Sequence, residues 1–305
     1  TVVACGNGTA GAFAPDALAR IGAEVIPMDC DLDNTFPAYK PNPEDMKMLH
    51  AMRDAVLEHG ADLAVGFDGD GDRCGIVDNE GEEIFADKVG VMLARDLSAQ
   101  YENAQFVADV KSTGLFATDP VLLANGAKTD YYKTGHSYIK RRSKELNALV
   151  GFEKSGHFFF NQPIGRGYDD AILTAIMICE MLDQNPERSL SDLRKTLPVT
   201  FDGHPLSAYC PDEHKYGAVE KIVSGLLDLK KNRLRFAGQF IHEINTINGA
   251  RVTTEDGSWG LIRASSNEPK IVVVAESPVS SSRRNEIISA LSMLMMDHGE
   301  IGALS

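Results

Sequence analysis

The feature that most constrains the fold is the alternation of apolar strands, glycine turns and helix-forming segments that begins at the first residues. A buried strand at Val2–Cys5 leads into the turn Gly6–Gly8, a helix at Ala10–Ile21 and a second strand at Ala23–Met28. Helices inserted between apolar strands are typical of α/β layers, in which helices cover a largely parallel sheet. The pattern therefore predicts an α/β fold.

A second α/β run starts after the hairpin turn Asp78–Gly81, and the character of the sequence changes again around Pro198. We therefore predict three domains, at 1–82, 83–197 and 198–305. The further predicted elements are helices at Pro43–Gly60, Ala86–Leu97, Asp169–Leu182, Ser191–Thr196, Tyr216–Leu229 and Ser282–Met296, and strands at Leu63–Phe67, Cys74–Val77, Phe106–Val110 and Lys128–Tyr132.

The charge balance excludes some classes of partner. There are 30 Lys and Arg residues against 44 Asp and Glu residues, which gives a formal net charge of -14. A nucleic-acid or anionic-membrane binder normally needs a basic face, so neither partner is expected. An anionic small substrate stays possible, because a few cations in one cleft can outweigh the global charge.

Apolar stretches and cysteines point to the cytoplasm. The longest apolar runs, such as Ile271–Ala275, are far shorter than the roughly 20 residues that span a bilayer. The five cysteines are scattered without the CxxC spacing, which indicates ordinary thiols in a reducing compartment and neither a zinc site nor a disulfide framework.

The strongest local signal is the loop Asp68–Arg73, in which Asp68, Asp70 and Asp72 alternate with glycines. Glycines allow the sharp turns that let carboxylates converge, and hard oxygen ligands favour Mg²⁺ or Ca²⁺. An EF-hand calcium loop is excluded, because its obligatory Gly and Glu positions hold Arg73 and Asn79. An acidic surface turn is the alternative.

The second signal is the loop Gly151–His157. Glu153 can accept hydrogen bonds from two sugar hydroxyls, Ser155 can donate and accept, and His157 can bond a hydroxyl or a phosphate. By itself the loop is equally well explained as a turn with a Glu–Lys salt bridge.

The third signal is Arg263–Pro269, where a guanidinium, two serine hydroxyls and an amide side chain follow an apolar strand. Such groups can form a phosphate cradle, although a polar turn stopped by proline has the same composition. Lys111 and the segment Lys133–Ser137 each follow a predicted strand, where α/β sheets place their ligand-binding groups. Asp169 and Asp170 are interpreted as the start of a helix.

Together and in this order, the loops resemble those of the α-D-phosphohexomutase superfamily, most closely its bacterial phosphomannomutase/phosphoglucomutase branch. Asp68–Arg73 matches the family's metal loop without a change, and Gly151–His157 matches its sugar-binding loop. Arg263–Pro269 matches the phosphate-binding loop, with Ser-Asn-Glu in place of the commoner Asn-Thr-Glu or Gly-Thr-Glu. Lys133–Ser137 resembles the interdomain segment of the dual-specificity branch. The resemblance covers essentially the whole chain.

The resemblance implies two related α/β sandwich domains with mixed sheets, followed by a smaller α+β C-terminal domain. It also implies an isomerase that interconverts hexose 1-phosphate and hexose 6-phosphate, of mannose or glucose, through a sugar bisphosphate. Mg²⁺ would be held by Asp68, Asp70 and Asp72. The implied catalytic residues are Arg73, Lys111, His136 and His157, and the implied substrate-binding residues are Glu153, Ser155, His157, Arg263, Ser265, Ser266 and Asn267.

One part of the family's pattern does not occur in these 305 residues. The family's first domain carries a Thr-Ala-Ser-His-Asn-Pro type loop whose serine donates the phosphoryl group, and Lys40–Pro43 shares only its Asn-Pro pair. We therefore expect the chain to correspond to domains two, three and four, and not to turn over substrate alone. A non-catalytic Mg²⁺- and sugar-phosphate-binding protein is the alternative. An aspartate-nucleophile phosphatase is a weaker one, because Gly71-Asp72 breaks its Asp-x-Asp-x-Thr/Val pattern.

Overall fold

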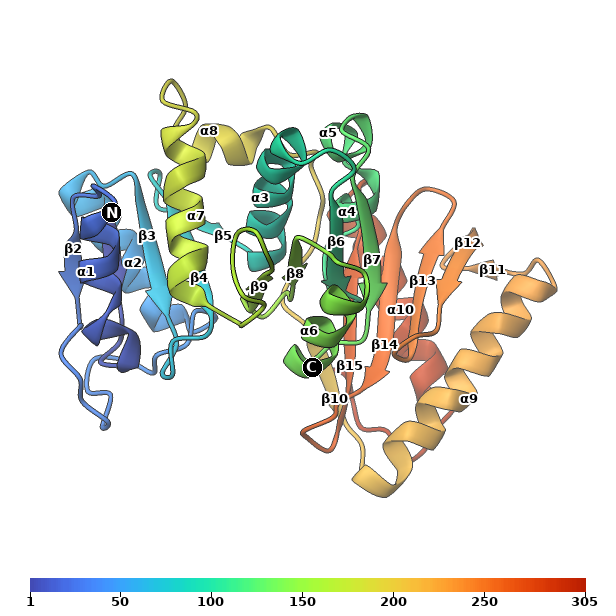
Figure 1. Cartoon of the computed structure of the whole chain (residues 1–305). Helices are drawn as coiled ribbons and strands as arrows, with labels where there is room; N and C mark the ends of the chain where they lie inside the picture. The colour runs from blue at the N-terminus through green and yellow to red at the C-terminus, as the bar shows by residue number, and fades with distance from the viewer. The chain divides into compact units, whose positions relative to one another are not determined.

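The computed structural model describes residues 1–305, which form two compact units (Figure 1). Unit 1 comprises Thr1–Leu197 and contains two sheets, and unit 2 comprises Pro198–Ser305 and contains one. None of the helices combines the length and the apolar character that a bilayer-spanning segment needs. The predicted fold class, α/β with mixed sheets followed by an α+β part, is confirmed.

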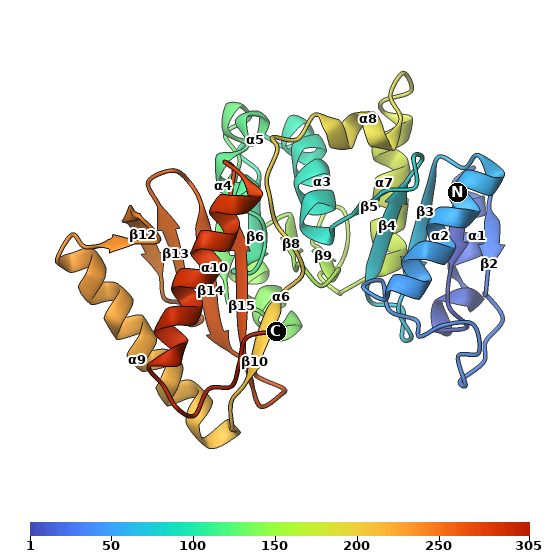
Figure 2. The same ribbon diagram turned by 180° about the vertical axis from the view of Figure 1, so that it is seen from behind.

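The first sheet of unit 1 is built from the residues before Phe85. Its elements are the strands β1 (Val2–Ala4), β2 (Ile26–Met28), β3 (Leu63–Phe67), β4 (Cys74–Asp78) and β5 (Glu83–Ile84), and the helices η1 (Thr9–Ala12, a 3-10 helix), α1 (Ala14–Arg20) and α2 (Met46–His59). The strand order is β2-β1-β3-β4-β5, with β1 parallel to β2 and β3 and with β4 and β5 antiparallel. Helix α1 lies in front of this sheet in Figure 1, and α2 lies in front of it in Figure 2.

The second sheet of unit 1 has the order β7-β6-β8-β9. Its strands are β6 (Gln105–Asp109), β7 (Lys128–Tyr132), β8 (Val150–Phe152) and β9 (Phe158–Phe160), and the helices around it are α3 (Ala86–Gln100), α4 (Leu115–Thr118), α5 (Pro120–Ala124), α6 (His136–Glu145), α7 (Ala171–Asp183) and α8 (Leu190–Lys195). β6 pairs in parallel with both β7 and β8. The carboxyl ends of these three strands therefore meet at one edge of the sheet.

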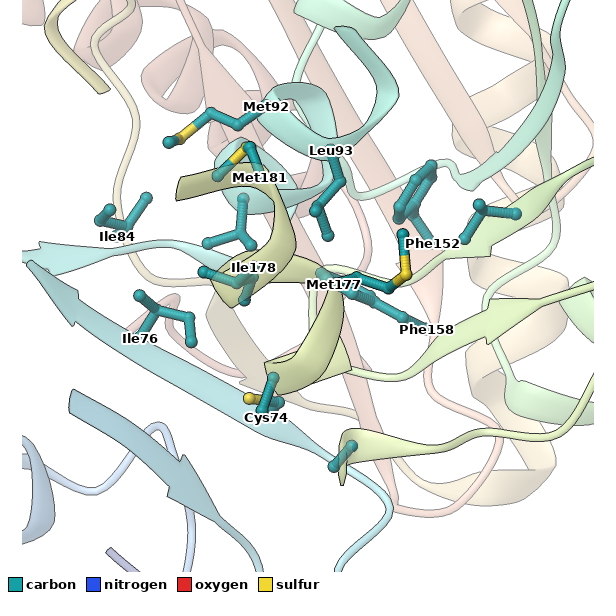
Figure 3. Close-up of a cluster of buried hydrophobic side chains, with 14 of the residues drawn as sticks. Cys74, Ile76, Ile84, Met92, Leu93, Phe152, Phe158, Met177, Ile178 and Met181 are labelled. Carbon is teal, nitrogen blue, oxygen red and sulfur yellow. The ribbon is translucent and has the colours of Figure 1, made fainter. Parts of the chain in front are cut away.

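One hydrophobic core joins the two sheets of unit 1 (Figure 3). Ile76 of β4 and Phe152 of β8 belong to this core, together with Ile178 of α7. The Phe152 ring stacks on Phe116 with a centroid distance of 5.1 Å and meets the edge of Phe158 at 5.2 Å. Because close-packed interiors resist deformation, this shared core holds the loops of the two sheets in a defined relation.

Unit 2 is a six-stranded antiparallel sheet with two long helices. Its elements are β10 (Leu206–Tyr209), α9 (Asp212–Lys231), β11 (Arg235–Phe236), β12 (Gln239–Asn245), β13 (Ala250–Thr254), β14 (Trp259–Ala264), β15 (Lys270–Glu276) and α10 (Ser281–Met296). The strand order is β10-β15-β14-β13-β12-β11. Ile262 and Val273 are partners across β14 and β15, and both lie in one core with Leu226 of α9 and Leu291 of α10.

Several helices differ from the sequence prediction, and α9, for example, begins at Asp212, four residues before the expected Tyr216. The helix expected at Ala10–Ile21 is interrupted at Phe13, whose φ of -132° is not helical, so that the 3-10 helix η1 precedes α1. The helix expected from Pro43 begins at Met46, since the Asp45 side chain caps it. Helix α6 was not predicted, because Ile139 and Ser143 are its only buried residues and leave no apolar stripe in the sequence.

Candidate functional site

Four of the predicted loops follow strands of unit 1. Asp68–Arg73 joins β3 to β4, Lys111 follows β6, Lys133–Ser137 lies between β7 and α6, and Gly151–His157 spans the end of β8 and the turn to β9. Hydrogen bonds connect them. The Cys74 N–H donates to the carbonyl of Gly156 at 3.2 Å, and the Gly135 N–H donates to Glu153 Oε1 at 3.1 Å.

Asp68 organises the acidic loop from inside. Its side chain is almost completely buried, and its Oδ1 accepts the backbone N–H groups of Gly71, Asp72 and Arg73 at 3.0 to 3.1 Å. Its Oδ2 accepts the Arg73 Nε–H at 2.7 Å. Burial opposes ionisation of Asp68, but these hydrogen bonds outweigh it and lower its pKa. The loop is therefore preformed around an ionised carboxylate.

Asp70 and Asp72 complete a group of three carboxylates. Each of Asp68, Asp70 and Asp72 offers an oxygen, and these oxygens lie within 4.8 Å of one another. Burial and then repulsion from Asp68, Asp70 and Asp169 raise the pKa of Asp72 to about 7. A cation would relieve this repulsion, and oxygen ligands of this kind suit a hard divalent ion.

Glu153 is a buried carboxylate of the second loop, with 3% of its surface exposed. Its Oε1 accepts the N–H of Gly135, and its Oε2 accepts the Ser155 hydroxyl at 3.2 Å. Burial and then repulsion from Asp109 raise the pKa of Glu153 to about 7, although Lys111 opposes the shift. The side chain can therefore change between acceptor and donor near neutral pH.

His157 connects the acidic loop with the start of α7. Its Nδ1 lies 3.6 Å from Asp72 Oδ1 and 3.6 Å from Asp169 Oδ2. Asp169 Oδ2 is also 3.6 Å from His136 Nδ1. Burial and then the charge of Arg73 lower the pKa of His157, so its ring is neutral at pH 7.

The interpretation of Asp169 as part of a helix start was therefore incomplete. Asp170 caps α7 by accepting the Leu173 N–H, whereas Asp169 lies beside two histidines of the candidate site. From the sequence alone, two consecutive aspartates before an apolar helix do not show which of them caps the helix and which contacts the candidate site.

Asp109, at the end of β6, is a connecting residue that the sequence analysis missed. It is fully buried, and its Oδ1 accepts the Ser112 hydroxyl at 2.6 Å and the Lys154 backbone N–H at 3.4 Å. Its Oδ2 accepts the Thr134 hydroxyl at 3.1 Å and lies 3.6 Å from Lys111 Nζ. One carboxylate thus ties three loops together. The sequence feature that could have indicated this role is an acidic residue at the end of a strand that is otherwise apolar.

A buried ion pair anchors the Gly151–His157 loop to α3. Lys154 Nζ lies 2.9 Å from Asp87 Oδ2, and the side chains of Lys154 and Asp87 are 8% and 0% exposed. Asp87 also accepts the Thr113 N–H at 2.8 Å. The ion pair fixes the loop at the residue between Glu153 and Ser155, whose side chains are hydrogen-bonded to each other. This pair too was not predicted.

The Arg263–Pro269 loop lies in unit 2, between β14 and β15. Arg263 and Ser265 are each 7% exposed, whereas Ser266 and Asn267 are exposed. The Ser265 Oγ accepts the N–H groups of Asn267 and Glu268 at 3.4 and 3.3 Å. The buried Lys215 donates to the Glu268 carbonyl at 3.0 Å, a contact the sequence did not suggest. The loop is therefore ordered and presents polar groups to solvent.

Family models match three parts of the chain. They describe phosphoglucomutase/phosphomannomutase alpha/beta/alpha domain II at residues 1–81, alpha/beta/alpha domain III at residues 85–201 and the C-terminal domain at residues 210–292. The chain belongs to the phosphoglucomutase/phosphomannomutase family. The acidic loop lies in the family's domain II, and the Gly151–His157 loop lies in its domain III.

Individual relatives agree with this membership. A phosphomannomutase/phosphoglucomutase of Pseudomonas putida is 34% identical over 272 residues, which are 89% of this chain and 55% of the relative. The chain thus spans about half the length of the curated relatives it matches. A phosphoglucomutase/phosphomannomutase family protein of Burkholderia thailandensis has a TM-score of 0.86 at 28% identity, over 99% of this chain and 61% of that one.

A more distant structure shares the fold. The N-acetylphosphoglucosamine mutase of Aspergillus fumigatus, solved in complex with GlcNAc-6P and magnesium, has a TM-score of 0.63 at 15% identity. It covers 98% of this chain and 61% of that one.

The Lys154–Asp87 pair leads to a prediction about stability. Lys154→Met leaves the Asp87 carboxylate buried without its cation, and breaking a buried pair in this way costs about 3–5 kcal/mol. We expect this loss in urea unfolding followed by far-UV circular dichroism. Asp87→Asn combined with Lys154→Met should recover part of it.

Lys144→Met, at an exposed position of α6, is the matched control and should change the free energy of unfolding much less. Equal losses for Lys154→Met and Lys144→Met would show that the buried pair does not anchor the loop.

Proposed function

We propose that this chain is the metal-, sugar- and phosphate-binding part of a phosphohexomutase, an isomerase that interconverts hexose 1-phosphate and hexose 6-phosphate through a bisphosphate. One observation carries the proposal. Unit 1 has three convergent carboxylates in a loop that is hydrogen-bonded to the loop bearing Glu153, Ser155 and His157. Membership of the phosphoglucomutase/phosphomannomutase family supports the same reaction.

The metal of the proposed site is Mg²⁺, held by Asp68, Asp70 and Asp72. The donor set fits this ion, because it consists of carboxylate oxygens that lie within 4.8 Å of one another. When bound, Mg²⁺ would neutralise charge on the phosphoryl group in transfer. Arg73, fixed against Asp68, supplies a second positive charge beside the acidic loop.

The proposed hexose-binding residues of unit 1 are Glu153 and Ser155, whose side chains are paired and can exchange that contact for sugar hydroxyls. His157 is neutral at pH 7 and can accept a proton from a hydroxyl group. Lys111 and His136 are proposed to contact phosphate oxygens, because both carry donors at strand or helix ends that adjoin the same loops.

The proposed phosphate-binding residues of unit 2 are Arg263, Ser265, Ser266 and Asn267. Arg263 is the second-last residue of β14 and pairs with Val272 of β15, and a guanidinium can hold two phosphate oxygens at once. The N–H bonds that Ser265 accepts keep the loop compact, so its exposed polar groups need little ordering when phosphate binds.

The proposal is tested by calorimetric titration of the chain, in the presence of Mg²⁺, with glucose 1-phosphate, mannose 1-phosphate and inorganic phosphate. We expect the hexose phosphates to bind more tightly than phosphate. Glu153→Gln should weaken hexose phosphate binding and leave phosphate binding unchanged, because it alters only the sugar contact. Equal affinities for all three ligands would contradict the proposal.

A second prediction concerns the phosphate contact. Arg263→Ala should weaken binding of glucose 1-phosphate and of inorganic phosphate about 10- to 100-fold, since charge-assisted hydrogen bonds contribute about 1.5–3 kcal/mol. Arg235→Ala removes an exposed arginine of unit 2, whose Nη1 donates to the nearby Gly238 carbonyl, and should leave both affinities unchanged. Equal effects of the two changes would mean that the loop is only a turn.

A third prediction follows from the raised pKa of Asp72, which is about 7. An ion that binds this carboxylate must displace its proton, so Mg²⁺ affinity should fall about tenfold per pH unit below about pH 7 and level off above it. Without the ion, the same shift means that the stability Asp72 contributes at low pH is lost as pH rises from 3.8 towards 7.

Asp72→Asn should bind Mg²⁺ more weakly and without this pH dependence. Calorimetry from about pH 5.5 to about pH 8, on both sides of the pKa of Asp72, measures both effects. A pH-independent affinity in the unaltered chain would contradict the assignment of Asp72 as a ligand.

A further inference from the structure

Two cysteines outside the proposed site lie side by side in unit 1. Cys5 directly follows β1, and Cys30 lies two residues beyond the end of β2. Their Sγ atoms are 3.5 Å apart, and Cys30 Sγ is also 3.4 Å from the carbonyl oxygen of Val3. The Cys30 side chain is therefore directed at the end of β1. Their spacing in the sequence indicates only ordinary thiols.

The backbone holds these two segments together independently of the sulfur atoms. The Cys5 N–H donates to the Met28 carbonyl at 3.0 Å, and the Asn7 N–H donates to the Asp29 carbonyl at 2.6 Å. The two sulfur atoms of a disulfide are about 2.05 Å apart, so the backbone segments that carry them must lie side by side. The two sulfur atoms, now 3.5 Å apart, would have to approach each other by about 1.5 Å, through rotation of the side chains and a shift of the loop after β2.

The two thiols differ in exposure. Cys5 is fully buried, whereas Cys30 is partly exposed. Their mutual hydrogen bond lowers the pKa of Cys30, although burial opposes this, and the same hydrogen bond together with burial raises the pKa of Cys5. A partly exposed thiol that ionises more readily is the one that a soluble oxidant attacks, and the buried neighbour can then act as the resolving thiol.

We propose that Cys5 and Cys30 form a peroxide-sensitive dithiol, a modification site that goes beyond the proposed mutase function and does not depend on it. In the first step the Cys30 thiolate attacks hydrogen peroxide, the O–O bond breaks, and sulfenic acid and hydroxide form. In the second step the Cys5 sulfur displaces the sulfenic hydroxyl, which leaves as water, and the S–S bond forms. Together the two thiols lose two electrons, and the peroxide is reduced to one water and one hydroxide, which becomes a second water by taking up the proton that Cys30 released when it ionised.

The Cys5–Cys30 pair is connected to the acidic loop Asp68–Arg73 through the turn that follows Cys5. Asn7 donates through its side chain to the Asp31 carbonyl, and the Thr9 N–H donates to the Gly69 carbonyl at 3.0 Å. The turn after Cys5 therefore contacts both the Cys30 segment and the loop that carries Asp68 and Asp70. A disulfide at Cys5 would fix the segment on which that loop rests.

The chain offers its own control for simple accessibility. Cys179 is partly exposed and lines a surface cavity of about 610 Å³, but it has no hydrogen bond with another cysteine. If accessibility alone decided the reaction, Cys179 and Cys30 would oxidise alike. If the outcome depends on a neighbouring thiol such as that of Cys5, only Cys30 forms a disulfide.

The experiment exposes the reduced chain to hydrogen peroxide, blocks the remaining thiols with N-ethylmaleimide and maps the products by mass spectrometry. We expect a loss of about 2 Da in a peptide pair that links Cys5 to Cys30, and its reversal by dithiothreitol. Cys179→Ser should react like the unaltered chain, and Cys30→Ser should form no disulfide. Cys5→Ser should leave a sulfenic acid on Cys30 that dimedone traps.

Two results would overturn the proposal, and both are read from the unaltered chain, so neither depends on the folding of a variant. One is Cys30 that remains reduced while Cys179 is oxidised. The other is Cys30 that advances to sulfinic acid while Cys5 remains a thiol.

Discussion

Unit 1 is organised by carboxylates that are buried at the ends of strands and helices. Asp68, Asp78, Asp87, Asp109 and Asp119 are all almost inaccessible to solvent. A buried charge without partners is too costly to persist, so each of these groups must be met by cations and amide hydrogens. Asp78 accepts the Arg194 Nε–H, and Asp119 accepts two N–H groups of Arg95, as Asp87 is met by Lys154. Each such contact fixes a loop or joins segments distant in sequence.

The need to compensate buried carboxylates also explains which carboxylates keep negative charge that can attract a cation. Asp68 is compensated by loop amides and Arg73, and Asp109 by hydroxyl groups, an amide and Lys111. Asp70 is exposed and Asp72 is crowded by other acids, so the excess negative charge is concentrated at the rim of the acidic loop. A binding site for a cation arises there because the carboxylates beneath it are already satisfied.

The sequence was sufficient for features that depend on neighbouring residues. The strand Leu63–Phe67 has the predicted bounds, since an apolar run is followed at once by an aspartate and glycine loop. The loops around Asp70 and Glu153 were also predicted, because their residue types are unusual together. What could not be predicted depends on distant partners. Lys154 meets Asp87 across 67 positions, and Cys30 meets Cys5 across 25. Local patterns carry no information on such pairs.

In the proposed site, the carboxylates of the acidic loop hold a divalent ion beside the loop that carries Glu153. The most direct measurement is a crystal structure of the chain grown with Mn²⁺ in place of Mg²⁺, and with glucose 1-phosphate, in which anomalous scattering locates the metal. We expect one strong peak coordinated by oxygens of Asp68, Asp70 and Asp72. A metal peak bound elsewhere, with these three side chains directed away from one another, would contradict it.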